Sequence, residues 1–344
     1  MSESLTDITE KIDYFLSCKI KEGWSDCFSV AVADRNDMLY EQYIGATDAT
    51  PDGRMQSVNQ RTRFNIASAT KPITAALIVK LMDEGELTLS DPVRRFIPEY
   101  PFEQITVQHL LDHSAGYDWE KTYSPKNFNA FHEYMNAMYS IKTLKFETGT
   151  RSEYFSAGFN VLMDIIQRVS ATDLESFAQQ HFFEPLRMQD TSFQVQKVKY
   201  ENTVFPKRTD GEAELFLGDL FVIGESGLYS NPGDLLKIGQ MLLQGGSYLG
   251  KSIFHERTAS FLLQEYTGNR FRKTPAFWMK TDVDTFGCFG DLHSGSAVGH
   301  TGYSGCMFWI DPMHNRTGAV LTNSIFLHTD WKRYKRINNM LMQL

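Results

Sequence analysis

The sequence lacks several features that would point to particular classes of protein. Its four cysteines among 344 residues form no C-x-x-C pair, which favours free thiols over a disulfide framework or a metal knuckle. No apolar run approaches the length that crosses a bilayer, and the first residues lack the basic and apolar regions of an export signal. We therefore expect a cytoplasmic protein without a membrane span, or a secreted one if a signal segment has been trimmed from the chain.

An excess of positive charge is also missing. The formal net charge is −8, whereas a phosphate-binding surface needs clustered lysine and arginine, so no nucleic-acid partner is expected. Basic residues at 332–336 are more simply the solvated face of a terminal helix. The segment from His109 to His113 has the i, i+4 histidine spacing of a zinc helix but lacks the glutamate at its second position. We expect neither a metal nor a cofactor.

Strand-like and helical patterns are distributed unevenly along the chain. Apolar runs typical of strands occur near both ends, whereas the middle is a series of helical stripes separated by loops. The predicted strands cover residues 27–33, 38–44, 285–289, 306–310 and 318–322, and amphipathic helices are predicted over residues 5–20 and from 331 towards 344.

One sheet built from the two termini accounts most economically for this distribution. We expect the α/β (α+β) class, with an antiparallel sheet from both chain ends flanked by helices and an inserted, mostly helical lobe. The length and the 42% hydrophobic content support one large domain. We assign residues 1–344 to it, with a sheet lobe at about residues 1–67 and 225–344 and a helical lobe at about residues 68–224.

The stretch from Phe64 to Ile78 carries the first chemical signal. A short β run breaks into a helix there, with Ser68 predicted at or beside the N-cap and one apolar face buried. Lys71 lies three residues later, on the same side of the first turn. A serine hydroxyl attacks poorly unless a neighbour takes its proton, and a lysine amine one turn away could do so. A capping serine followed by a solvated lysine is the structural alternative.

Two further segments also allow both a catalytic and a purely structural interpretation. Tyr154 precedes a predicted helix, where its phenol could share a proton with a nearby lysine, or simply pack at the helix entry. Residues 299–305 are rich in glycine and stand before a strand. Small residues there let the backbone approach a ligand and lend an N–H group to an oxyanion, although such a loop can also only turn the chain.

The three segments together resemble a known family. Ser68-Ala-Thr-Lys71, Tyr154-Phe-Ser156 and His300-Thr-Gly302 follow the order of the S-x-x-K, Y-x-N and K-T-G or H-T-G elements of the serine β-lactamase and penicillin-binding-protein superfamily. The likeness runs from about residue 25 to about residue 325 and is nearest in style to the branch of class C β-lactamases, D,D-peptidases and family VIII esterases. It implies that Ser68 is the acylated nucleophile, Lys71 its proton partner and Tyr154 the general base or proton shuttle.

The resemblance implies further roles. The oxyanion hole would be formed by backbone N–H groups of Ser68 and Tyr303, and the substrate would be contacted by Ser156, His300, Thr301, Gly302 and Trp119. Two of these residues depart from the family pattern, since Ser156 stands where asparagine is usual and His300 replaces the lysine of β-lactamases. A serine has a shorter side chain with one donor, and a neutral histidine holds a carboxylate less firmly than a lysine does.

These departures favour one function over its alternatives. We expect a serine hydrolase that acts as an esterase or a D-amino-acid peptidase or amidase on a small ester, D-peptide or β-lactam-like substrate. A β-lactamase or D,D-carboxypeptidase is the first alternative, and it would need export to reach cell-wall substrates. A catalytically weak binding or regulatory protein that keeps an inherited pocket is the second. The G-x-S-x-G signature of the α/β-hydrolases does not occur in the sequence.

Overall fold

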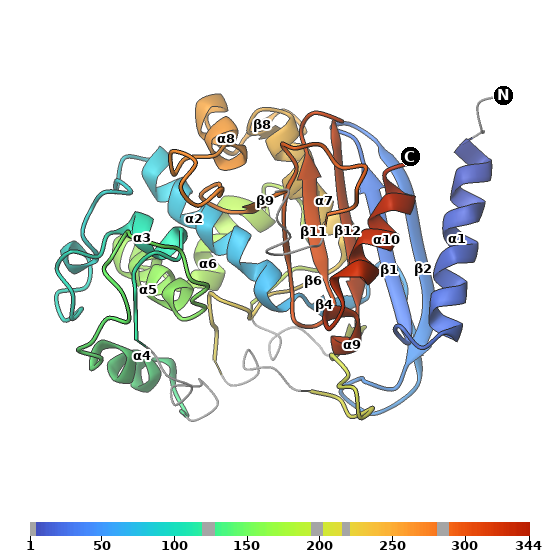
Figure 1. Ribbon diagram of the computed structural model, residues 1–344, viewed down its shortest axis with the longest axis horizontal. Helices are drawn as coiled ribbons and strands as arrows, with labels where there is room; N and C mark the ends of the chain where they lie inside the picture. Colours follow the sequence, from blue (N-terminus) through green and yellow to red (C-terminus); the bar gives the residue numbers. More distant parts are fainter. Residues whose placement is uncertain (1–4, 119–127, 194–201, 215–220, 281–288) are drawn as a thin grey trace.

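The computed structural model describes residues 5–118, 128–193, 202–214, 221–280 and 289–344, and its centre is a seven-stranded sheet (Figure 1). Neighbouring strands are antiparallel throughout, in the order β3-β2-β1-β12-β11-β10-β9. The strands are β1 (Cys27–Ala33), β2 (Met38–Thr47), β3 (Gln56–Ser57), β9 (Trp278–Met279), β10 (Val298–Thr301), β11 (Met307–Asp311) and β12 (Arg316–Thr322).

The two ends of the chain meet at the middle of this sheet. Val30 of β1 pairs with Gln42 of the neighbouring β2 and with Val320 of β12. The predicted architecture, one antiparallel sheet from both termini, is therefore confirmed. The predicted strand at 285–289 lies almost wholly outside the described residues.

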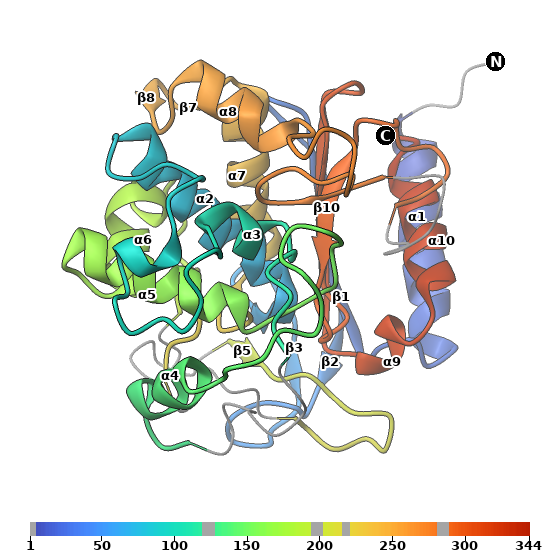
Figure 2. The ribbon, with the colours of Figure 1, turned by 60° about the vertical axis from the view of Figure 1, so that its left-hand side comes forward.

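Helices cover both faces of the sheet, and β1 is therefore buried at every position. Figure 2 shows α1 (Leu5–Lys21) and α10 (Trp331–Leu341) on the face away from the helical part of the molecule. Val30 and Val32 point into the core beneath these two helices, whereas Ala31 and Ala33 point to the opposite side. This alternation is the period of two expected for a strand.

The other face is covered first by α7 (Pro232–Leu243), which packs on β1 and β12. The contact is close, because a Cβ added to Gly239 would lie 2.1 Å from the Thr317 hydroxyl oxygen. A glycine at this point lets the helix backbone sit directly on the sheet.

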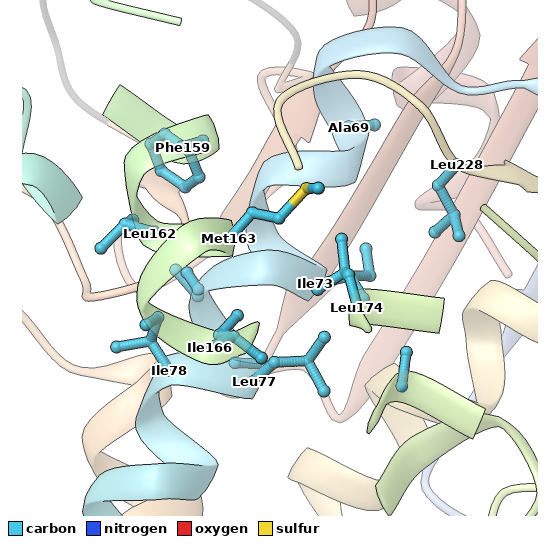
Figure 3. Packing of buried hydrophobic residues seen from close by; sticks show 14 of the residues in the cluster. Ala69, Ile73, Leu77, Ile78, Phe159, Leu162, Met163, Ile166, Leu174 and Leu228 are labelled. Carbon is cyan, nitrogen blue, oxygen red and sulfur yellow. The ribbon is translucent and has the colours of Figure 1, made fainter. Parts of the chain in front are cut away.

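Beyond α7 lies the helical lobe, which is built around α2 (Lys71–Asp83). The sequence predicted one buried face for this helix, but residues 71–79 are buried without exception. The reason is that α2 has neighbours on several sides, including α5 (Gly158–Ser170) and α8 (Glu256–Leu263). Figure 3 shows the apolar side chains of α2 and α5 packed against each other.

The remaining elements are short and connect these layers. They are β4 (Arg63–Asn65), η1 (Ala67–Thr70), η2 (Val93–Arg95), α3 (Val107–Leu111), α4 (Phe131–Tyr139), α6 (Leu174–Ala178), the π-helical turn η4 (Gln179–Phe183), β5 (Thr203–Val204), β6 (Tyr229–Ser230), β7 (Ser247–Tyr248), β8 (Lys251–Ser252) and α9 (Ile325–His328). The boundaries assigned to the two lobes stay a prediction. Within the described ranges, no helix has the length and apolar character needed to cross a membrane.

Candidate active site

Ser68 lies on a tight turn between a short strand and the central helix. β4 ends before the 3-10 turn η1, and α2 begins only at Lys71. The sequence predicted Ser68 at or beside the N-cap, but the N-cap is Thr70, two residues later, and its side chain makes no capping hydrogen bond. The backbone tightens into a 3-10 turn before the helix starts, which leaves the Ser68 hydroxyl to a different partner.

The backbone around Ser68 is strained and closely enclosed. Ala67 has φ of 47°, in the left-handed region that costs free energy for a residue with a Cβ, and its N–H group donates to the Asn65 side-chain oxygen at 2.7 Å. The turn that contains Gly302 presses on this segment, since a Cβ at Gly302 would lie 2.0 Å from the Ile66 carbonyl oxygen. Only glycine fits there, and the H-T-G element therefore abuts the nucleophile turn.

Lys71 points back at Ser68. Its amine donates to the Ser68 hydroxyl oxygen at 3.0 Å and to the Glu225 carbonyl oxygen at 2.9 Å. The side chain is 1% exposed, and the amine lies 5.0 Å from the ring centre of Tyr154 and 5.7 Å from that of Phe159. A buried amine that is hydrogen-bonded to a serine hydroxyl is the arrangement that proton transfer from serine requires.

Tyr154 lies on the loop before α5 and is half-buried. Its ring centre is 4.8 Å from that of His113, 6.2 Å from that of Trp278 and 6.3 Å from that of His300. The three motifs, distant along the sequence, therefore come together around Ser68 and Lys71.

His300 and Thr301 occupy the end of β10, and each is only 3% exposed. The His300 Nδ1 atom lies 2.7 Å from the Thr301 carbonyl oxygen, and its Nε2 atom is buried without a hydrogen-bond partner in the described residues. Burial, with the positive charge of Lys71 nearby, lowers the pKa of His300 to about 3. The ring is therefore neutral at ordinary pH, and its predicted contact with a substrate stays a prediction.

The remaining predicted residues have different surroundings. Tyr303 is 46% exposed, with its ring centre 5.5 Å from that of His328. Ser156, at the start of the turn into α5, is partly buried, and its side chain lowers the pKa of the Glu225 carboxyl. Trp119 lies outside the described residues.

A family model described as Beta-lactamase matches residues 15–336 of the chain. The chain belongs to the beta-lactamase family. An N-acetylmuramyl-L-alanine amidase of Bacillus subtilis is 25% identical to this beta-lactamase-family hydrolase, over 91% of the chain and 80% of that protein. A putative D-alanyl-D-alanine carboxypeptidase of Salmonella paratyphi B is 22% identical, over 91% of the chain and 82% of that protein.

The fold agrees with the family. The solved structure of EstCE1, described as a hydrolase with promiscuous acyltransferase activity, superposes on this beta-lactamase-family chain with a TM-score of 0.81. The two are 17% identical, and the match covers 98% of this chain and 99% of that one. The resemblance inferred from the three motifs is confirmed at the level of the family and the fold.

Sequence reasoning gave no role to two buried residues of this family member, Glu225 and Asn160. Glu225 is 7% exposed, and the polar side chains of Asn160 and Ser156 act on its carboxyl, whose pKa they lower. Burial raises the pKa of Glu225, against the opposing effects of the Lys71 charge and of these two side chains. Asn160 follows Ser156 by one helical turn, a spacing that could have revealed it, whereas no local pattern marked Glu225.

A second group of buried polar residues borders the candidate active site. The Lys273 amine donates to the Asp112 carbonyl oxygen at 2.9 Å and lies 3.8 Å from the ring centre of Trp278. Burial lowers the pKa of Lys273 and raises that of Asp112. A cavity of about 10 Å³, with room for about one water molecule, is bordered by Lys273, Trp278, His113, His300 and Lys71.

The histidine pair that suggested a zinc helix does not lie on one helix face. α3 ends at Leu111, and His113 follows it with φ of 57° and its ring against the backbone of Phe155. The His109 ring instead closes the N-terminal cap of the helix with Thr106. Among the described residues, no three histidine, cysteine or acidic side chains gather as metal ligands would.

Proposed function

We propose that this protein is a serine acyl hydrolase that cleaves small, uncharged esters through an acyl-enzyme on Ser68. The observation that carries the proposal is the 3.0 Å hydrogen bond from the buried Lys71 amine to the Ser68 hydroxyl oxygen. Membership of a hydrolase family, on its own, leaves the nucleophile and the substrate open.

The proposed reaction has two steps. The Ser68 oxygen attacks the ester carbonyl carbon, its proton passes to Lys71 with the Tyr154 phenol as shuttle, and the same groups return a proton to the departing alkoxide. Water then attacks the acyl-enzyme and releases the acid and free Ser68. The negative charge that develops on the carbonyl oxygen is assigned to the backbone N–H groups of Ser68 and Tyr303, and removal of one such donor costs about 10²–10³ in rate in comparable sites.

The preference for uncharged substrates is inferred from His300. β-Lactams and peptides with a free carboxyl terminus present a carboxylate, and the lysine of the K-T-G element would attract it. Here the corresponding ring is neutral and 3% exposed, because its pKa is lowered to about 3. An uncharged ring lacks the charge-assisted hydrogen bond that holds a carboxylate strongly.

A pocket of about 140 Å³ lies beside Tyr154 and is lined also by Tyr117, Lys145 and Glu153. This volume is well above the roughly 10–15 Å³ that admits a single water, so the pocket has room for a short acyl or alcohol group. A butyryl ester is therefore a suitable first substrate.

A second candidate, a D-amino-acid amidase or peptidase, is favoured by the relatives that are described as an amidase and a putative D-alanyl-D-alanine carboxypeptidase. It uses the same acyl-enzyme with an amine as the leaving group. The two candidates differ in the bond cleaved and in the charge of the substrate, and both differ from a protein that only binds.

The test compares hydrolysis of p-nitrophenyl butyrate, a D-alanyl anilide and nitrocefin by the wild-type protein and by Ser68→Ala. We expect turnover of the butyrate ester, much slower turnover of nitrocefin, and loss of both in the variant. Faster turnover of the anilide than of the ester would favour the second candidate. A folded wild-type protein that turns over none of them, or a Ser68→Ala variant as active as the wild type, contradicts the proposal.

A further inference from the structure

Glu225 is a buried acid that the mechanism above does not use, yet it is attached to the residues that the mechanism needs. Its carbonyl oxygen accepts a hydrogen bond from the Lys71 amine at 2.9 Å. The preceding residue, Gly224, accepts from the Thr74 hydroxyl at 2.7 Å and donates to the Asn160 side chain at 3.0 Å. The segment that carries Glu225 is thus hydrogen-bonded to both α2 and α5.

In the part of the chain that the structure describes, the hydrogen bonds of the Lys71 amine bring no negative charge to it. The amine donates to two neutral oxygens, the Ser68 hydroxyl and the Glu225 carbonyl, and the Lys71 side chain is buried. An ammonium ion in these surroundings is costly unless an opposite charge lies close by. Among the described residues, Lys71 from α2 and Tyr134 from α4 interact electrostatically with the Glu225 carboxyl. Tyr154, His113 and His300 face the Lys71 amine from other segments.

Ser156 connects this acid to the departure seen in the sequence. The family usually has an asparagine at this position, beside the lysine. The shorter Ser156 side chain, together with that of Asn160, instead lowers the pKa of the Glu225 carboxyl, and Asn160 also accepts a hydrogen bond from the backbone N–H of Gly224 at 3.0 Å. A carboxyl from another segment therefore lies in the neighbourhood that the longer asparagine side chain would serve.

We propose that Glu225 is a positioning residue of this active site, which with Ser156 replaces the family's asparagine by holding Lys71 and stabilising the positive charge that Lys71 gains. The inference rests on the proposed function, because the step that Glu225 would assist is the transfer of the Ser68 proton to Lys71. No bond to Glu225 forms or breaks, and the residue acts through Lys71 alone.

The test is the rate at which a fluorophosphonate probe modifies Ser68, measured from about pH 5 to about pH 9 in Glu225→Gln. Glutamine keeps the shape and can bond to Ser156 and Asn160, but it removes the charge. We expect modification to be at least about tenfold slower at the wild-type optimum. We also expect the acidic limb of the pH–rate profile to move to lower pH, because Lys71 gives up its proton more readily once the neighbouring negative charge is removed. A merely structural role for Glu225 would not displace this limb.

Glu175 supplies a matched control. It is also a buried acid, 9% exposed, and it lies in α6. Its carboxyl accepts hydrogen bonds from Gln179, Ser192 and the backbone of Phe193, and in the described residues none of its hydrogen bonds involves Lys71. We expect Glu175→Gln to keep the wild-type rate and pH dependence even if its melting temperature falls.

A rescue experiment tests the replacement of asparagine directly. Glu225→Ala removes the carboxyl and should also slow modification about tenfold or more, and adding Ser156→Asn should recover a large part of the rate. If Glu225→Gln does not fold, Ser156→Ala, which removes one partner of the same carboxyl, takes its place in the pH measurement.

Each outcome decides the matter. A folded Glu225→Gln with the rate and pH profile of the wild type overturns the inference and leaves the proposed function intact, as does a double variant no faster than Glu225→Ala. A wild-type protein that the probe does not modify overturns the proposed function, and the inference falls with it.

Discussion

Replacing Gly302 by alanine should separate the geometry of the active site from the stability of the fold. A Cβ at this position would lie 2.0 Å from the Ile66 carbonyl oxygen and 3.2 Å from the Ala67 Cβ. Because Cβ contacts below 3.0 Å essentially do not occur, the end of β10 must move by about 1 Å from the turn that carries Ser68. A misplacement of about 1 Å in a catalytic arrangement can cost about 10²-fold in rate.

In Gly302→Ala we therefore expect a fluorophosphonate to modify Ser68 about 10²-fold more slowly than in the wild type. Hydrolysis of p-nitrophenyl butyrate should slow by about the same factor. The loss of unfolding free energy should be about 1–3 kcal/mol, as for other overpacked sites. Gly295→Ala is the control, since a Cβ there meets nothing within 4 Å. Equal rates for Gly302→Ala and Gly295→Ala would refute the placement of the H-T-G element against the nucleophile.

Three further predictions concern the proposed catalytic residues, two buried histidines and the contact between α7 and the sheet. Lys71→Met and Tyr154→Phe should each slow butyrate hydrolysis by about 10²-fold or more while leaving the circular dichroism spectrum unchanged, and wild-type rates in both would remove these residues from the mechanism. Burial lowers the pKa of His293 to about 4 and that of His300 to about 3, so the unfolded chain binds protons first as the pH falls below about 6.5. At pH 5 each should cost about 2 kcal/mol of unfolding free energy relative to pH 8, and His293→Phe should show a shallower loss in thermal melts; an equal slope would contradict this. Gly239→Ala places a Cβ 2.1 Å from the Thr317 hydroxyl and should lower the unfolding free energy by about 1–3 kcal/mol, whereas Gly233→Ala, 3.5 Å from its nearest neighbour, should not.

The sheet and its flanking helices could be predicted from the sequence because their signals are local. The hairpin of β1 and β2 has two apolar runs around a polar turn, and α10 has a strong apolar stripe. The proximity of Ser68 and Lys71 is also local, since three residues of helical chain bring two side chains to the same side. The sequence predicted one sheet from both ends of the chain because strand patterns occur at both ends, and the pairing of β1 with β12 agrees with that prediction.

Other features depend on contacts between distant segments and have no local signal. Ala67 adopts a left-handed conformation against its own preference, because Asn65 bonds its N–H group and Gly302 presses from β10. The burial of His300 is decided by packing around the small cavity that it shares with His113 and Trp278. A motif match specifies that a histidine is present, and only the surrounding structure specifies that it is neutral.

Glu225 shows the same limit most clearly. It lies 154 positions from Lys71 in the sequence, and its hydrogen bond to that residue joins a loop to the central helix. The substitution of serine for asparagine at position 156 was visible in the sequence, but the acid that accompanies it was not. A residue that departs from a family motif is therefore best interpreted together with the side chains that surround it in the structure.

The central claim is that Ser68 forms the acyl-enzyme, and mass spectrometry of the intact protein tests it most directly. After incubation with a fluorophosphonate ester, the account predicts one added organophosphoryl group, located on the peptide that contains Ser68 and absent from Ser68→Ala. A folded protein that gains no mass, or an adduct that persists in Ser68→Ala, would contradict it.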